Sequence, residues 1–240
     1  MQAVLMAGGK GTRLRPYTNI LPKPLLPIGL RSIIEINIRQ LARFGVDNII
    51  IAVGYLGELI ESIIGDGNKY GINIIYSYEE KLLGTVGGLS LVHDKLEDNF
   101  LVMNGDILHN VDCNVFMAHH IDTNSSVTIA TYKKAHKVKL GVLETKDEQV
   151  VNYIEKPTQK YNVSMGIYLL NKSIVGQYIN DNKPLDFPDL INQLIRDKKS
   201  ISLFFHKGLW IDLGTSDEYL NILDRLNDIH DTYPEIPIIL

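Results

Sequence analysis

Short apolar runs alternate with segments of helical periodicity over the first 110 residues of the chain. Four of the runs are only a few residues long, which predicts buried strands over residues 4–7, 48–55, 72–78 and 99–106. Between them, apolar side chains recur at helical spacing, which predicts helices over residues 32–45, 56–65 and 87–96. Strands that alternate with helices of about ten residues pair in parallel through right-handed crossovers.

The pattern changes after residue 110. Four strand-like runs follow one another with mostly turn-length gaps, over residues 126–133, 139–146, 149–156 and 163–170. Closely spaced runs of this kind are typical of antiparallel strands. Helical periodicity returns over residues 186–199 and 215–229, and the second of these begins with a capping-box spacing. The predicted fold class is α/β, with a doubly wound, mostly parallel central sheet and an antiparallel extension.

The chain is predicted to be a single domain, residues 1–240, with two lobes. The first lobe covers about residues 1–110 and the second about residues 111–225, and no linker or repeat separates them. No hexapeptide series follows the last predicted helix, so we expect no β-helix domain. The apolar tail YPEIPIIL suits either a subunit contact, as in a homo-oligomer, or a return to the core.

Composition narrows the class of protein. Hydrophobic residues make up 45% of the chain and charged residues 22%, close to the averages for soluble globular proteins. No apolar run approaches the roughly 18 residues of a membrane helix, and the N-terminus lacks the features of a signal peptide. The net charge of −4 gives no reason to expect a nucleic acid or a membrane as partner. We therefore expect a cytoplasmic protein, and the single cysteine, Cys113, fits a reducing compartment.

Positive charge is concentrated at the start of the chain, around the stretch GGKGTRLRPYTNILPKPLLP. Residues 1–34 contain five Lys or Arg and no Asp or Glu, whereas the remainder has 19 basic and 28 acidic residues. Glycines after a strand let the backbone direct N–H groups at phosphate oxygens, and Lys10, Arg13 and Lys23 can add charge-assisted hydrogen bonds. The spacing fits neither a Walker loop nor a dinucleotide fingerprint. The alternative interpretation is a tight turn with a solvated basic rim.

Two aspartates and one acid–base pair are further candidates. Asp106 follows a buried strand, where a carboxylate can hold Mg²⁺ that bridges phosphates, and Asp212 lies among apolar residues, where an unpaired acid is costly to bury. Glu155 and Lys156 lie at another strand end. The simpler alternatives are a turn aspartate and a surface ion pair. The seven histidines form no metal-ligand spacing, and His119-His120 is interpreted as a solvated pair.

Seven motifs occur in the order seen in the sugar-1-phosphate nucleotidyltransferases. They are GGKGTRLRPYT, PKPLLP, LGTVGG, NGD, EKP, SMGIY and WIDLGT. The sequence therefore resembles this family over residues 1 to about 225, and within it the mannose-1-phosphate guanylyltransferase branch. The resemblance implies a nucleotide-diphospho-sugar transferase fold, in which the antiparallel extension binds the sugar.

The resemblance also implies roles for individual residues. Two are catalytic: Arg13 on the departing pyrophosphate and Lys23 on the α-phosphate. The nucleotide is assigned to Gly8, Gly9, Gly11, Thr12, Gly84, Thr85, Gly88 and Gly105. The sugar phosphate is assigned to Gly141, Glu155, Lys156 and Gly166. Asp106 and Asp212 would hold Mg²⁺ as the cofactor.

The implied activity joins an NTP, with GTP as the first choice, to a sugar 1-phosphate and releases pyrophosphate. Mannose 1-phosphate or a related hexose or heptose phosphate is the expected acceptor, in nucleotide-sugar and polysaccharide biosynthesis. Two alternatives stay open. One is a uridylyl- or thymidylyltransferase that acts on glucose 1-phosphate or an amino-sugar 1-phosphate, and the other is a non-catalytic subunit that binds a sugar nucleotide.

Overall fold

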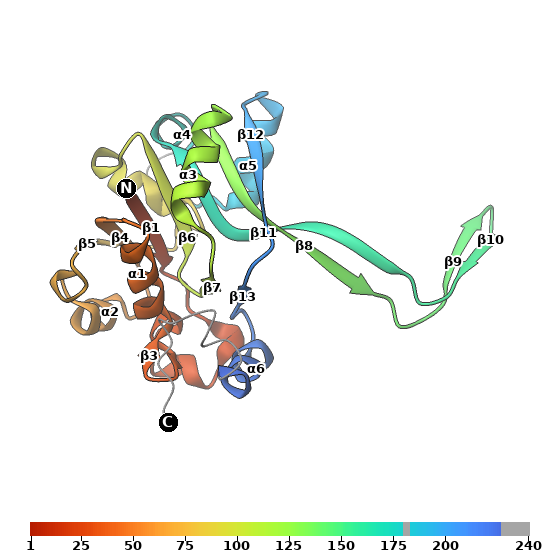
Figure 1. Ribbon diagram of the computed structural model, residues 1–240, viewed down its shortest axis with the longest axis horizontal. Helices are drawn as coiled ribbons and strands as arrows, with labels where there is room; N and C mark the ends of the chain where they lie inside the picture. Colours follow the sequence, from red (N-terminus) through yellow and green to blue (C-terminus); the bar gives the residue numbers. More distant parts are fainter. Residues whose placement is uncertain (180–182, 227–240) are drawn as a thin grey trace.

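A seven-stranded mixed sheet forms the centre of the molecule. The computed structural model describes residues 1–179 and 183–226 (Figure 1). The strand order is β12-β8-β11-β6-β1-β4-β5. Four neighbouring strands are parallel, namely β6 (Asn99–Asn104), β1 (Gln2–Ala7), β4 (Asn48–Val53) and β5 (Asn73–Tyr78). The predicted α/β fold class, with its mostly parallel first half, is confirmed.

The second half of the chain extends the sheet beyond β6. β11 (Thr158–Asn171) is antiparallel to both β6 and β8 (Val127–Lys137). β12 (Ile201–His206), which the apolar pattern did not predict, pairs in parallel with β8. Three short two-stranded sheets complete the strands, formed by β2 (Pro27–Ile28) with β3 (Arg31–Ser32), β7 (Ile107–His109) with β13 (Trp210–Asp212), and β9 (Val142–Lys146) with β10 (Gln149–Ile154).

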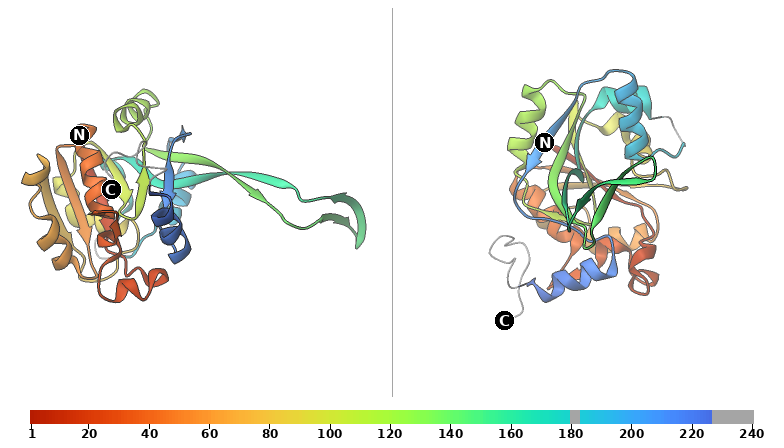
Figure 2. Two further views of the ribbon diagram at one scale, coloured as in Figure 1. Left: turned by 60° about the horizontal axis from the view of Figure 1, so that its bottom comes forward. Right: turned by 90° about the vertical axis from the view of Figure 1, so that its right-hand side faces the viewer.

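Helices cover both faces of the sheet. Alternate residues of each strand point to opposite faces, so that Leu5 and Val4 belong to different apolar clusters. One cluster takes side chains from α1 (Ile33–Arg43), α2 (Gly57–Ile64) and α3 (Cys113–Asp122). The other takes them from α4 (Lys172–Tyr178), α5 (Phe187–Arg196) and the 3-10 helix η5 (Gly87–Lys95). The result is three layers with the sheet in the middle (Figure 2).

A third apolar cluster fixes the loop that follows β1. Leu14 and Leu26 are buried against α1, β7 and α6 (Ser216–Asp224). Burial of each such side chain contributes about 1.5–3 kcal/mol. The short 3-10 turns η1 (Thr12–Leu14), η2 (Tyr17–Asn19) and η3 (Lys23–Leu25) lie in this loop, and η4 (Asn68–Tyr70) precedes β5. The basic opening stretch is thereby a packed part of the fold and not a free loop.

The structure corrects several local expectations. The predicted helix over residues 87–96 is a 3-10 helix that starts with two glycines, and the helices α3 and α4 had not been predicted. His120 is only 1% exposed and bonds to Thr128 and Asn99, so the interpretation of a solvated histidine pair was wrong. The Thr215–Glu218 capping box is present at the start of α6. The apolar tail and the end of the last predicted helix lie outside the described residues.

A long two-stranded arm projects from the body. We define the arm as residues 133–162, which comprise the outer parts of β8 and β11 together with β9 and β10 (Figure 1). The predicted antiparallel extension of the central sheet is therefore formed by β8 and β11 only, while β9 and β10 pair with each other at the end of the arm. At its root, Lys133 lies over the ring of Phe205 and Lys134 over that of Trp210.

Candidate active site

The turn after β1 depends on glycine at one position. Gly11 has φ +60°, and a Cβ there would lie 2.9 Å from Cγ2 of Thr18. The hydroxyl of Thr18 donates to the Gly11 carbonyl at 2.8 Å, which closes the loop. Both conditions exclude a larger side chain, because the left-handed region is strained for other residues and the space is occupied. The loop therefore keeps its backbone close to whatever lies above it.

Lys23 is held at the floor of the site by its surroundings. The residue is 7% exposed and lies in the turn formed with Pro24 and Leu25, whose side chains are also buried. Its ammonium group forms an ion pair with the carboxylate of Asp106, which lies two residues after the end of β6. A buried charge needs such a partner, since breaking a buried pair is strongly destabilising. The structure thus brings together two residues that are 83 positions apart in the sequence.

Asp212 reaches the same region from the end of the chain. β13 pairs antiparallel with β7, which places Asp212 opposite Ile107, and the amide of Leu213 donates to the Asp106 carbonyl at 3.1 Å. A Cβ added to Gly214 would lie 3.1 Å from Asp212 Oδ1 and 3.6 Å from a guanidinium nitrogen of Arg13. Contrary to the expectation of burial, Asp212 is accessible to solvent.

The charges of the neighbouring groups act on Asp212. Partial desolvation and the Asp106 carboxylate raise the pKa of its carboxyl group, and Lys23 and Arg13 oppose this effect. A divalent cation held by both carboxylates would relieve the effect of the Asp106 charge on Asp212. The described residues contain no group of three or more His, Cys, Asp or Glu side chains arranged to hold a metal ion. Two carboxylates suit Mg²⁺, which usually keeps several waters and takes its other oxygens from a substrate.

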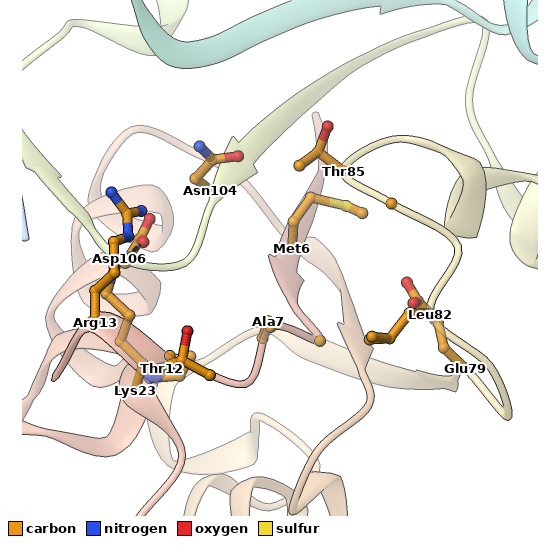
Figure 3. A pocket seen from close by; sticks show the side chains of 15 residues that line it. Met6, Ala7, Thr12, Arg13, Lys23, Glu79, Leu82, Thr85, Asn104 and Asp106 are labelled. Atoms are coloured by element: carbon orange, nitrogen blue, oxygen red, sulfur yellow. Dashed lines mark hydrogen bonds and ion pairs between the residues drawn. The ribbon is translucent and has the colours of Figure 1, made fainter. Parts of the chain in front are cut away.

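A cavity of about 450 Å³ opens above the glycine loop. Its volume falls within the range of roughly 300–1,000 Å³ that is usual for small-molecule sites. It lies at the carboxyl ends of β1 and β6, where open α/β sheets bind ligands. The lining residues are Met6, Ala7, Gly8, Gly9, Gly11, Thr12, Arg13, Lys23, Pro24, Glu79, Leu82, Gly84, Thr85, Asn104 and Asp106. In Figure 3, Arg13, Lys23 and Asp106 lie at one end, and Glu79 and Leu82 lie at the other.

Glu79 is a lining residue that the sequence reasoning missed. It follows β5, and its Oε2 accepts a hydrogen bond from the amide of Leu83 at 3.2 Å. Partial burial raises the pKa of its carboxyl group. A Cβ on Gly88 would lie 2.4 Å from Glu79 Oε1, so glycine at position 88 makes room for this carboxylate. An acidic residue directly after a parallel strand was the signal available in the sequence.

The remaining predicted nucleotide residues support the cavity wall. Gly84 has φ +79°, and a Cβ there would lie 2.5 Å from the Leu185 carbonyl oxygen. The amide of Thr85 donates to Asp186 at 2.8 Å, and its hydroxyl accepts from the amide of Phe187 at 2.9 Å. Gly105 donates its amide to the Met6 carbonyl at 2.9 Å. Gly88 and Gly105 shape the wall without lining the cavity.

The predicted sugar-phosphate residues are placed elsewhere. Gly166 has φ +73° at the irregularity in β11, and its missing Cβ would lie 2.7 Å from the Asn104 amide nitrogen. Gly141, Glu155 and Lys156 lie on the arm. The Glu155 and Lys156 side chains are more than half exposed and pair with each other at 3.3 Å. The structure brings Gly166 up to the cavity wall and leaves the other three outside the cavity, where their role stays a prediction.

Comparison with known proteins identifies relatives of the chain. Residues 2–228 match the nucleotidyl transferase family. A D-glycero-alpha-D-manno-heptose 1-phosphate guanylyltransferase from Aneurinibacillus thermoaerophilus is 32% identical over 91% of this chain and 95% of its own length. A mannose-1-phosphate guanyltransferase from Yarrowia lipolytica is 32% identical over 92% of this chain, which spans 62% of that longer relative.

The fold is also found among solved structures. The crystal structure of HddC from Yersinia pseudotuberculosis matches with a TM-score of 0.73 and 25% identity, over 94% of this chain and 99% of the other. No helix in residues 1–179 and 183–226 is both long and apolar enough to cross a membrane. The family match extends over nearly the whole chain and agrees with the order of the seven motifs. The prediction from those motifs is confirmed, and the chain belongs to the nucleotidyl transferase family.

Proposed function

We propose that this protein transfers a nucleotidyl group from an NTP to a sugar 1-phosphate and releases pyrophosphate. The observation that carries this proposal is the cavity itself. It joins a cationic end, formed by Arg13, Lys23 and the glycine loop, to a recess lined by Glu79 and Leu82 that is suited to a base. A nucleoside triphosphate has the same two ends, and relatives that are 32% identical are guanylyltransferases of sugar 1-phosphates.

The reaction requires the protein to position two anions and to stabilise charge. A phosphate oxygen of the sugar 1-phosphate forms a bond to the α-phosphorus of the NTP, the bond between the α- and β-phosphates breaks, and pyrophosphate leaves with the electron pair. Lys23 lies on the cavity floor beside Asp106, and Arg13 lies on the same side. Preorganised cations of this kind stabilise the charge that develops in phosphoryl-type transfer. The proposed catalytic residues are therefore Arg13 and Lys23.

Members of this family generally use divalent metal ions. For this chain we propose Mg²⁺, which Asp106 and Asp212 would hold. When bound, the ion would neutralise charge on the phosphate oxygens. Partial desolvation and the nearby charge of Asp106 raise the pKa of Asp212, which supports this assignment. The ion pair between Lys23 and Asp106 places the ammonium group directly beside the proposed metal position.

We propose GTP as the nucleotide, on the basis of Glu79. An ionised carboxylate only accepts hydrogen bonds. The Watson–Crick edge of guanine offers two adjacent donors, the ring N–H and the exocyclic amino group. Uracil and thymine offer one N–H between two carbonyl oxygens, which a carboxylate would repel. Because Glu79 Oε2 is engaged by Leu83 and partial burial raises its pKa, this carboxylate gains from partners that donate.

A grid of NTPs against sugar 1-phosphates tests the proposal, with released pyrophosphate as the measurement. We expect the highest kcat/KM with GTP and a manno-configured hexose or heptose 1-phosphate. Glu79→Gln should lower the preference for GTP over UTP by about tenfold, because one charge-assisted hydrogen bond is lost. The exposed neighbour Glu80 provides the matched control, Glu80→Gln.

Two results would contradict this proposal. If UTP or dTTP is the preferred nucleotide in wild-type protein, the assignment of guanine to Glu79 is wrong and the uridylyl- or thymidylyltransferase alternative holds. If nucleotide binds but no pair of substrates yields pyrophosphate, the protein is a non-catalytic sugar-nucleotide-binding subunit.

A further inference from the structure

The arm is a thin ribbon with exposed apolar side chains. Every residue of β10 and most residues of β9 are exposed. The large apolar side chains with at least a third of their surface exposed on the arm are Leu140, Leu143, Val150, Val151, Tyr153, Ile154 and Tyr161. A two-stranded ribbon is at best marginally stable in water, and a cluster of exposed apolar side chains indicates an interaction surface. The arm therefore has the character of an element that packs against another surface.

The cavity, in turn, lacks a wall from the second lobe. Every residue that lines it lies between Met6 and Asp106. No described residue after Asp106 belongs to the lining, although the proposed reaction needs a cradle for a second anion beside the first. The candidates for that cradle, Glu155 and Lys156, lie on the arm. Docking on another surface would cover the exposed apolar side chains of the arm. The same docking could bring Glu155 and Lys156 to a cavity that has no lining residue from the second lobe.

Charge separates the arm from the rest of the molecule. Residues 133–162 contain seven lysines and four acidic residues, whereas the remainder of the chain contains 17 Lys or Arg and 24 Asp or Glu. The arm is thus positive and the remainder negative. This difference in charge favours docking of the arm on the acidic part of the body of another copy of the same chain, outside the cationic opening stretch.

The geometry of the root directs the arm away from its own body. β8 runs without a break from the buried Val127 to the exposed Lys137. Phe205 and Trp210 hold the root through Lys133 and Lys134. In Figure 1 and in the left view of Figure 2 the arm projects clear of the body. An unbroken, anchored strand does not bring Lys156 back to the cavity of its own chain.

We infer that the arm docks on a second copy of this chain, where its Glu155–Lys156 pair forms the sugar-phosphate wall of that copy's cavity. Reciprocal exchange of two arms gives a closed, two-fold dimer in which both interfaces are the same. This inference rests on the proposed function, and the role of Lys156 in it is the one that the resemblance to the sugar-1-phosphate nucleotidyltransferases implies. Its geometry rests on the arm and the cavity. Each active site of the dimer then contains residues from two chains.

Complementation between two inactive variants tests the exchange. Lys23→Met disables the cavity and Lys156→Ala disables the arm, and the two are co-expressed with different tags. In a 1:1 mixture of the two chains, half of the dimers are heterodimers. One of the two sites of each heterodimer combines an intact cavity with an intact arm. We therefore expect about one quarter of wild-type activity. Arg13→Ala replaces Lys23→Met if that variant fails to fold. No recovery above the separate variants would overturn the exchange.

A crosslink gives a second measurement that does not depend on activity. Leu82 lines the cavity and is 55% exposed, and Cys113 is buried with the pKa of its thiol raised to about 12, so it does not compete. A chain with Leu82→Cys is mixed with a chain with Lys156→Cys, refolded together and treated with a short bismaleimide. We expect a covalent heterodimer, and much less product with Ile195→Cys on the outer face of α5, which is 59% exposed.

The two measurements separate the inference from the proposed function. If wild-type protein yields no pyrophosphate with any substrate pair but the Leu82–Lys156 crosslink forms, the function is wrong and the exchange stands. If wild-type protein is active but is a monomer by light scattering at micromolar concentration, and the crosslink does not form, the exchange is wrong and the function stands.

Discussion

The loop after β1 and the arm both carry charged residues with predicted roles, but the fold holds them in different ways. Lys23 is 7% exposed, lies among buried neighbours and has its charge matched by Asp106. Lys156 is more than half exposed and touches only the adjacent Glu155 among the ion pairs found. A buried cation is preorganised by its own chain, whereas an exposed cation acquires a fixed position only when something docks on it. The proposed nucleotide half of the site therefore lies within one chain, and we infer that the sugar half is completed by a second chain.

Loss of the buried cation should have the largest effect. We expect Lys23→Ala to lower kcat/KM by a factor of about 10²–10³, because a preorganised charge at the reacting phosphate is removed. Lys10 lies in the same loop but is exposed and outside the cavity lining, so Lys10→Ala should change kcat/KM less than about threefold. Pyrophosphate release measures kcat/KM for both variants. If kcat/KM falls equally in both, catalysis depends on the total positive charge of the loop and not on the position of Lys23.

Loss of the exposed cation should be smaller and should affect the other substrate. We expect Lys156→Ala to reduce kcat/KM for the sugar 1-phosphate by about 10², with little change in the KM for the nucleotide. Lys160→Ala, which removes an exposed lysine from the same arm, provides the control. If Lys156→Ala instead raises the KM for the nucleotide, Lys156 contacts the nucleotide and its assignment to the sugar phosphate is wrong.

Acid should weaken the body of the molecule through its buried histidine, His109. Complete burial lowers the pKa of His109 from 6.5 to about 3, so the folded protein keeps this side chain neutral while the unfolded chain takes up a proton below pH 6.5. Its contribution to stability is present above pH 6.5 and is lost as the pH falls toward 3, which amounts to about 2 kcal/mol between pH 6.5 and pH 5.

Chemical denaturation at these two pH values measures this loss. His109→Gln should flatten the pH dependence, although the lowered pKa values of His120 and His206 leave part of it in place. If the stability of His109→Gln falls between pH 6.5 and pH 5 as much as that of the wild type does, the buried imidazole does not cause this pH dependence.

The smallest expected effect is a gain in stability at Asp212, one of the two proposed metal ligands. The raised pKa of Asp212 means that its ionised form is disfavoured in the folded protein above the ordinary value of 3.8. Asp212→Asn removes this penalty, and because solvent screens the exposed carboxyl, we expect less than about 1 kcal/mol, or a Tm higher by roughly 2 °C at pH 7. Activity should fall in the same variant. A lower Tm would show that Asp212 is a structural residue.

The sequence predicted the parallel half of the fold well because its signals are local. Apolar runs such as residues 48–55 and periodic segments such as residues 32–45 each report on their own element. The glycine loop, Lys23 and Asp106 could be placed together because the carboxyl ends of β1 and β6 meet at one edge of the sheet. α3 carried one usable signal, the side chain of Asp112, which accepts from the amides of Asn114 and Val115.

The sequence could not predict where the antiparallel strands go. The run at residues 139–146 has the same composition whether it joins the central sheet or forms an arm, because pairing depends on residues far away in the chain. The irregularity in β11 between Ser164 and Tyr168 marks the point at which the strand, paired with β8 alone up to Ser164, begins to pair with β6 as well. A Cβ on Gly166 at this point would meet Asn104 and Ile107. Glu79 was missed because an acidic residue that follows a strand, here beside Glu80, is usually a turn residue.

The order of the parts along the chain has a consequence for synthesis. The residues that line the cavity end at Asp106, the arm begins at residue 133, and the aromatic rings that hold its root, Phe205 and Trp210, come last. Domains form from the N-terminus as the chain leaves the ribosome. The cavity and an unanchored arm therefore emerge before the root is fixed, and adjacent chains on one messenger present both surfaces to each other at high local concentration. We expect pairing to begin there, before either chain is released.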